Sequence, residues 1–202
     1  MNGAQRKPQR EPHGRPLSLM SCILILAPHC DDEILGCGGT IAKAKAQGIP
    51  VHVGIVTNGH LGDPELFPKS GTEKVRRETL EAHRNLQVDS TVFFDFPTPR
   101  LDTVPSYRIS TRISELLRET KATHLYVPHR GDIHIDHKIT FDAALVASRP
   151  TTGHQVEKIL AYETVSETEW AAPFASEAFI PNVFHDISDH LQAKLEAFSK
   201  YT

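Results

Sequence analysis

Short apolar runs alternate with longer amphipathic stretches along most of this chain. The apolar runs are rich in Val, Ile and Leu without alternating polar residues, which is typical of strands buried on both faces of a parallel sheet. Their alternation with helix-length segments predicts βαβ units, and hence a single α/β domain whose mostly parallel sheet is covered by helices on both faces. The predicted strands are 22–27, 51–57, 91–96, 124–128, 157–163 and 182–187, and the predicted helices are 39–48, 72–88, 107–120, about 137–148 and a last one from about Asp189.

Residues 1–19 lack this pattern and carry three prolines, two glycines and four basic residues. Because they have almost nothing to bury, we expect a disordered N-terminal extension, followed by one domain over 20–202. With 39% hydrophobic residues, 23% charged residues and a formal net charge of -3, the chain resembles an ordinary globular protein and has no basic field to favour nucleic acid. Its longest apolar run near the start is too short to span a bilayer. Three cysteines within sixteen residues offer no disulfide framework, which favours a reducing cytoplasm.

Two clusters of polar residues follow predicted strands. The sequence "PHCDDE" follows the first strand, and "PHRGDIHIDH" follows the fourth. In open parallel sheets the ligand site lies beyond the carboxyl ends of the strands, so we expect both clusters at the same edge of the sheet. If a helix begins near His134, then His134 and His137 share one face of its first turn, while Asp136 is displaced around the axis and can orient a neighbouring ring.

The first cluster places three adjacent carboxyl groups and a histidine where repulsion and desolvation both oppose folding. A divalent cation held by His29, Asp32 and one histidine of the second cluster would replace that repulsion by attraction. Two histidines and one carboxylate with an open position suit a catalytic zinc site, and also a non-haem iron site. The free carboxylate of Asp31 would accept a proton from metal-bound water, which favours hydrolysis over oxygen activation.

Other interpretations of these residues stay open. The three carboxyl groups could begin a helix, where the positive end of the dipole favours acidic side chains, and the second cluster could be a solvated loop. The glycines at 36, 38 and 39 match neither the dinucleotide fingerprint nor the P-loop, so we expect them to allow close packing of a helix on a strand. We interpret Cys30 and Cys37 as buried thiols. The histidines to which we assign surface, packing or structural roles are His52, His60, His83, His124, His154 and His190.

The two clusters together carry the motifs of a known family. The signature His-Pro-Asp-Asp-Glu followed by Gly-x-Gly-Gly reads here "HCDDEILGCGG", and the later Asp-x-His-x-Asp-His reads "DIHIDH". In these motifs the chain resembles the PIG-L or LmbE-like de-N-acetylases, zinc-dependent enzymes that hydrolyse the N-acetyl group of GlcNAc-containing compounds on a Rossmann-like sheet. The similarity extends over nearly everything from about residue 20 onward, through "IVTNG", "RRETLEAHRNLQV", "LYVPH" and "PNVFHDIS".

The resemblance implies a metal site and also shows two departures from the family. It assigns zinc binding to His29, Asp32 and His137, with Fe²⁺ or another divalent metal as the alternative. Cys30 stands where the family usually has proline, which removes a rigid φ from the turn but no ligand. The chain ends at Thr202, inside the last predicted helix, where family members usually continue, so a C-terminally shortened domain is one interpretation.

The resemblance also implies a reaction. Asp31 would be the general base, and His134, supported by Asp136, would stabilise the oxyanion or donate a proton. The expected activity is that of a metal-dependent amidohydrolase that removes the N-acetyl group from a GlcNAc-type conjugate and releases acetate. The alternatives are metal-dependent hydrolysis of an ester or phosphoester, an iron-dependent oxygenase, for whose cosubstrate the sequence shows no pocket, and a non-catalytic metal-binding module.

Candidate substrate contacts come from three arginines. Arg76 or Arg77, in the helix after the loop 58–71, and Arg100, in "PTPRLD", could hold sugar hydroxyls or a carrier phosphate. Exposure on a solvated helix face is the alternative for at least one of the pair. We therefore expect a cytoplasmic enzyme that acts on a small-molecule amino-sugar conjugate, and a homo-oligomer is compatible with that expectation.

Overall fold

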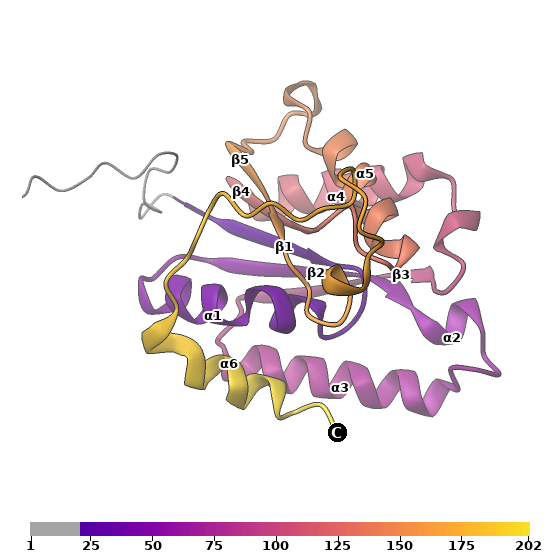
Figure 1. Cartoon of the computed structure of the whole chain (residues 1–202), viewed down its shortest axis with the longest axis horizontal. Helices are drawn as coiled ribbons and strands as arrows, with labels where there is room; N and C mark the ends of the chain where they lie inside the picture. The colour runs from indigo at the N-terminus through magenta and orange to yellow at the C-terminus, as the bar shows by residue number, and fades with distance from the viewer. Residues whose placement is uncertain (1–20) are drawn as a thin grey trace, which may run out of the picture.

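One five-stranded sheet forms the centre of the molecule. The computed structural model describes residues 21–202, so the extension predicted at 1–19 lies outside the described residues. All neighbouring strands run parallel, in the order β3-β2-β1-β4-β5 (Figure 1). The predicted α/β, Rossmann-like fold is therefore confirmed, with a wholly parallel sheet. The strands are β1 (Ile23–Ala27), β2 (Val51–Asn58), β3 (Ser90–Pro97), β4 (His124–Pro128) and β5 (Lys158–Tyr162).

Helices cover both faces of this sheet. Helices α1, α3 and α6 pack together on one face, and α4 and α5 pack on the other (Figure 1). Within residues 21–202, no helix is both long enough and apolar enough to cross a membrane. The helices are α1 (Asp32–Ala46), α2 (Gly59–Gly62), α3 (Lys69–Asn85), α4 (Ser106–Thr120), α5 (Ile135–Ala147) and α6 (Leu191–Phe198), with 3-10 turns η1 (Leu101–Thr103), η2 (Pro150–Thr152), η3 (Thr168–Trp170) and η4 (Ser188–His190).

The central strand β1 contributes to both halves of the hydrophobic core. Ile23 and Ile25 pack with the α1, α3 and α6 side, whereas Leu24 and Leu26 pack with the α4 and α5 side. This division follows from the strand geometry, because successive side chains point to opposite faces. All four side chains are at most 1% exposed, so the strand that leads into the first polar cluster is held on both faces.

The prediction of a sixth strand at 182–187 is wrong. This segment is irregular and belongs to the connection between β5 and α6 (Figure 1). It packs on α1 instead of joining the sheet: Lys43 Nζ donates to the carbonyl oxygen of Asp186 at 2.8 Å, and Ile187 lies against Gly39. Phe184, which made the segment look like a strand, is 78% exposed. Of the apolar residues that suggested a strand, Ile187 packs on helix α1 and not on a neighbouring strand.

The glycines of α1 allow close packing, as predicted. A Cβ atom at Gly36 would lie 2.3 Å from the ring of Tyr162 in β5. A Cβ atom at Gly38 would lie 2.9 Å from the side chain of Lys194 in α6. Side chains at these positions would push α1 away from β5 and from α6, so the glycines set the separation of these elements.

Candidate metal centre

The turn from β1 into α1 presents the first polar cluster. Helix α1 begins at Asp32, seven residues before the predicted start, so the acidic residues do form its first turn. Asp31 is the N-cap residue, yet its side chain makes no capping hydrogen bond. The backbone N–H of His29 instead donates to Asp32 Oδ2 at 2.8 Å. The helix-start interpretation thus describes the backbone correctly but does not account for the Asp31 carboxyl group.

The turn from β4 into α5 presents the second cluster. Helix α5 begins at Ile135, two residues before the predicted start, and His134 is its N-cap residue. The backbone N–H of Asp136 donates to His134 Nδ1 at 3.2 Å. His137 lies in the first turn and is fully buried. His134 and His137 therefore stand at the same end of one helix, as their spacing predicts.

The two turns meet because β1 and β4 are neighbours in the sheet. Asp32 Oδ2 lies 3.3 Å from His29 Nδ1 and 3.3 Å from His137 Nε2. One ligand atom from each of these three residues can be chosen so that all lie within 4.8 Å of one another. Two imidazoles and one carboxylate from distant segments thus surround a common point, which is the donor set of a catalytic zinc or non-haem iron site.

Both ring nitrogens of His137 have the surroundings expected of a metal-binding histidine. Its Nε2 is buried and has no hydrogen-bond partner among residues 21–202, although it faces the Asp32 carboxylate. Its Nδ1 donates to Asp132 Oδ2 at 2.8 Å, and Thr168 Oγ1 donates to the other oxygen of Asp132 at 2.6 Å. A metal-binding histidine commonly donates its second ring N–H to a carboxylate, which orients the ring and fixes its tautomer. The unpaired Nε2 is therefore available as a ligand.

A second group of possible ligands shares one residue with the first. His29, His134 and Asp136 also bring ligand atoms within 4.8 Å of one another. His29 Nε2 donates to Asp136 Oδ2 at 3.2 Å, and Thr98 Oγ1 donates to the same oxygen at 2.6 Å. The Asp136 carboxylate thus contacts His29 directly and lies 3.9 Å from His134 Nδ1, whereas the hydrogen bond to His134 comes from the backbone N–H of Asp136. The support that the motif implies for His134 comes from this backbone contact.

Comparison with known proteins identifies the family. Residues 24–148 match the profile of the PIG-L family, described as GlcNAc-PI de-N-acetylase. The chain belongs to the PIG-L family. It is 26% identical over 185 residues to the uncharacterized deacetylase YaiS of Escherichia coli K12, in an alignment that covers 89% of each protein.

Solved structures share the fold of this PIG-L family member. The conserved protein TT1542 from Thermus thermophilus has a TM-score of 0.71 and 27% identity, with 90% of this chain and 79% of that chain covered. The N,N'-diacetylchitobiose deacetylase from Pyrococcus horikoshii, complexed with its inhibitor, has a TM-score of 0.70 and 22% identity, with 89% and 69% covered. The second likeness supports the fold, and the family assignment rests on the profile.

The histidines of the PIG-L cluster carry positive charge in the metal-free protein. Burial lowers the pKa of His29, but hydrogen bonds to Asp136 and Asp32 outweigh it and raise that pKa to about 10. Burial likewise lowers the pKa of His137, and the hydrogen bond to Asp132 together with the Asp32 carboxylate, 3.3 Å from Nε2, raises it to about 9. Protons on the two rings therefore offset the buried carboxylates in the metal-free protein.

Two neighbouring carboxyl groups have opposite pKa displacements. Burial favours a raised pKa for Asp32, but the His137 and His29 rings, each 3.3 Å from Oδ2, hold its pKa well below the ordinary range. Burial, followed by the charges of Asp32 and Glu33, raises the pKa of Asp31 to about 7. Burial and then the charge of His29 lower the pKa of His134. Asp31 can accordingly exchange a proton near neutral pH, while His134 is a neutral imidazole there.

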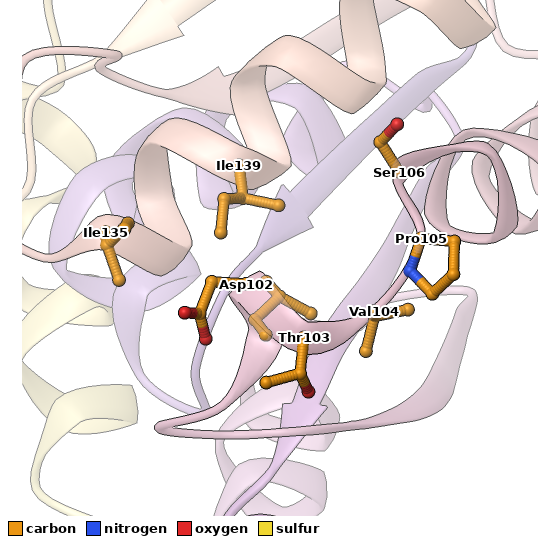
Figure 2. Close-up of a pocket in the computed structure, with 8 residues that line it drawn as sticks. Asp102, Thr103, Val104, Pro105, Ser106, Ile135 and Ile139 are labelled. Atoms are coloured by element: carbon orange, nitrogen blue, oxygen red, sulfur yellow. The ribbon is translucent and has the colours of Figure 1, made fainter.

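The three candidate arginines lie in different surroundings. Arg76 pairs with Asp95 and stacks over the ring of Phe93, with its guanidinium carbon 4.4 Å from the ring centroid. Arg77 is exposed on α3, and Arg100 is exposed immediately before η1. A cavity of about 520 Å³ lies between residues 101–106 and the side chains of α5 that follow His134 in sequence (Figure 2). Arg100 thus directly precedes in sequence the residues that line this hollow, whereas Arg76 is already paired with a carboxylate.

Several residues that contact this site were not assigned to it from the sequence. His83, for which a surface or packing role was predicted, is only 2% exposed, and its Nε2 donates to Glu33 Oε1 at 2.9 Å. Thr98 and Thr168 donate to carboxylates that contact the metal-site histidines. These threonines are far in sequence from the carboxylates that they contact, so no local sequence pattern predicts the contacts. Glu33, however, is part of the quoted motif and could have been examined for a buried partner.

Proposed function

We propose that this PIG-L family member is a metal-dependent amidohydrolase that removes the N-acetyl group from a GlcNAc-type amino-sugar conjugate and releases acetate. The observation that carries the proposal is the cluster of His29, Asp32 and His137, next to which Asp31 has a carboxyl group that makes no capping hydrogen bond. Family membership supports the reaction class. Three free thiols fit the reducing cytoplasm proposed for the enzyme.

His29, Asp32 and His137 would hold the cation, with zinc as the proposed metal and Fe²⁺ as the alternative. When bound, the ion supplies Lewis acidity toward the amide carbonyl and increases the acidity of a water molecule. Asp31, whose carboxyl group makes no capping hydrogen bond, would accept the proton that this water loses. The same group can then return the proton to the departing amine.

His134 is suited to the charge that develops on the carbonyl oxygen. Its Nδ1 accepts the hydrogen bond from the Asp136 backbone, so the neutral ring carries its proton on Nε2. Burial and the charge of His29 lower the pKa of His134 in the metal-free protein, and a cation held by His29 would favour the neutral ring in the same way. An imidazole Nε2–H held by a helix terminus can donate to the oxyanion without being consumed as an acid.

Acetate release across a panel of GlcNAc conjugates, with and without a chelator, tests the proposal. Asp31→Asn should retain the metal and lose at least ~100-fold in turnover, the magnitude of a missing general base. His137→Ala should lose the metal as well, and Asp189→Asn, at an exposed carboxyl group, serves as the matched control. Release of phosphate or cleavage of an ester, without acetate release, would reject the amidohydrolase in favour of another hydrolase.

A further inference from the structure

The backbone of Asp31 adopts a conformation that needs outside support. Its φ is 114° and its ψ is -28°, values that residues other than glycine rarely adopt. Such conformations persist where the surrounding structure fixes them, and they are common at functional sites. The carbonyl oxygen of Asp31 accepts the first hydrogen bonds of α1, from the N–H groups of Ile34 and Leu35, both at 2.9 Å. These bonds fix the carbonyl group of Asp31 but do not involve its N–H group or its side chain.

Glu33 provides the partner for the N–H group. Its Oε2 accepts a hydrogen bond from the backbone N–H of Asp31 at 3.2 Å. In a capping box the acidic residue at the third helical position bonds the N-cap N–H and the N-cap side chain bonds back to the helix, and Glu33, at the second position, makes a bond of the first kind. Here only the first half is present, because the side chain of Asp31 makes no cap bond. The N-cap carboxyl group is thereby left free for another use.

The carboxyl group of Glu33 is itself fixed from outside the turn. It is fully buried, and its Oε1 accepts hydrogen bonds from His83 Nε2 at 2.9 Å and from the Tyr201 hydroxyl at 3.3 Å. The second ring nitrogen of His83, Nδ1, lies 2.6 Å from Thr91 Oγ1. His83 stands on α3 and Thr91 on β3, and neither of these two elements carries a proposed metal ligand.

We propose that Glu33 and His83 are a positioning pair for Asp31. His83 fixes the Glu33 carboxyl group, Glu33 fixes the Asp31 N–H, and the strained turn then keeps the Asp31 carboxyl group at the reaction centre and away from its own helix terminus. The inference rests on the proposed function, because Asp31 is a base only in that reaction. Neither residue of the pair contacts substrate, so both act through Asp31.

A purely structural role for this buried pair makes a different prediction. Loss of a buried hydrogen bond would then lower stability without selectively changing turnover. Two substitutions at position 83 separate the roles, because a glutamine amide nitrogen reaches about as far as His Nε2, whereas an asparagine amide reaches only as far as Nδ1. His83→Gln can keep the bond to Glu33, and His83→Asn loses it while remaining polar. His124→Asn is the matched control, at a buried histidine that also contacts a threonine hydroxyl, Thr123 Oγ1, at 2.9 Å.

Two measurements on the full-length protein decide the matter. The first is the exchange rate of the Asp31 amide hydrogen in the metal-free protein, measured by NMR and needing no activity. The second is kcat and KM for acetate release, with metal content measured in parallel. For His83→Asn we expect ~10-fold faster exchange at Asp31 and ~10-fold lower kcat, with KM and metal content unchanged. His83→Gln should stay within ~3-fold of the wild type in both measurements, and His124→Asn should resemble the wild type.

The possible outcomes separate the two proposals. Unchanged exchange at Asp31 in His83→Asn would overturn the positioning role, and so would an equal loss of kcat in His83→Asn and His124→Asn. If the wild type releases no acetate from any conjugate, the proposed function fails. The exchange rates of the same variants then still decide whether Glu33 and His83 hold the Asp31 turn.

Discussion

Replacing Asp31 by asparagine should make the metal-free protein more stable at neutral and alkaline pH. The substitution removes a charge from a mostly buried site beside Asp32 and Glu33, and these surroundings raise the pKa of Asp31 to about 7. Asparagine keeps the size of the side chain and tolerates a positive φ better than most residues. The variant therefore isolates the cost of the charge from effects of shape and backbone.

The magnitude follows from the displacement of the pKa of Asp31, from its ordinary value of 3.8 to about 7. Each pKa unit corresponds to ~1.4 kcal/mol, which gives an upper bound on the order of 4 kcal/mol for the free energy of unfolding. Part of the side chain reaches solvent, so we expect a gain of about 2–3 kcal/mol. The pKa of Asp31 is higher in the folded state than in the unfolded state. The loss of stability caused by its charge is therefore absent below pH 3.8, grows as the pH rises toward 7 and is constant above pH 7.

Urea unfolding of the metal-free wild type, Asp31→Asn and Asp189→Asn, between about pH 5 and about pH 9, measures this cost. The difference between the wild type and Asp31→Asn should widen up to about pH 7 and then stay level. Added Zn²⁺ should reduce the difference in stability between the wild type and Asp31→Asn, because a cation favours the charged form of Asp31. A difference that is the same at every pH would refute the reasoning, since charge burial would then not explain it.

Three further predictions concern the metal and the packing around it. Zn²⁺ binding near pH 7 should release protons from His29 and His137, whose pKa values hydrogen bonds raise to about 10 and about 9 against the lowering effect of burial. Calorimetric titration in two buffers of different ionisation enthalpy measures the release, and buffer-independent heats would contradict it. Asp132→Asn should weaken zinc binding ~10–100-fold in a competition assay with a chromophoric chelator; unchanged affinity would mean that this carboxyl group does not orient the ring it contacts. Gly62→Ala should lower the free energy of unfolding by ~2–4 kcal/mol, because the new Cβ would lie 1.9 Å from a backbone oxygen of the connection after β3. Gly71→Ala, whose Cβ would meet its nearest atom only at 3.8 Å, is the control and should not be destabilised.

Much of the fold could be predicted because parallel strands buried on both faces leave continuous apolar runs in the sequence. Five of the six predicted strands exist, and the predicted helices overlap α1, α3, α4, α5 and α6, although α1 begins seven residues before its predicted start and the short α2 was not predicted. The order of the strands could not be predicted, since a local pattern does not say which strand lies beside which. The strand predicted at 182–187 was wrong for the same reason, namely that a local pattern does not show which element a residue contacts. Ile187 packs on Gly39 of α1, and nothing in the segment distinguishes that contact from a contact within a sheet.

The placement of the two clusters at one edge of the sheet was predictable for a topological reason. Residues that follow parallel strands must reach the same edge of the sheet, and His29 and His137 come together there because β1 and β4 are neighbours, which the sequence does not show. The residues behind them were not predictable in this way. His83 reaches Glu33 across 50 positions, and the sequence marks such a pair only by an acidic residue and a histidine with no other evident role.

The first turn of α1 divides two chemical roles between adjacent carboxyl groups by giving hydrogen bonds to only one of them. Asp32 receives the N–H of His29 and faces two imidazole rings, so it stays charged and can bind a cation at any physiological pH. The Asp31 carboxyl group makes no capping hydrogen bond, and burial and repulsion raise its pKa toward neutrality. A carboxyl group that capped its own helix would be stabilised in the charged form and would be a weaker base. In the proposed reaction the strained backbone of Asp31 therefore has a chemical consequence: by turning the side chain away from the helix terminus, it keeps the proposed base reactive.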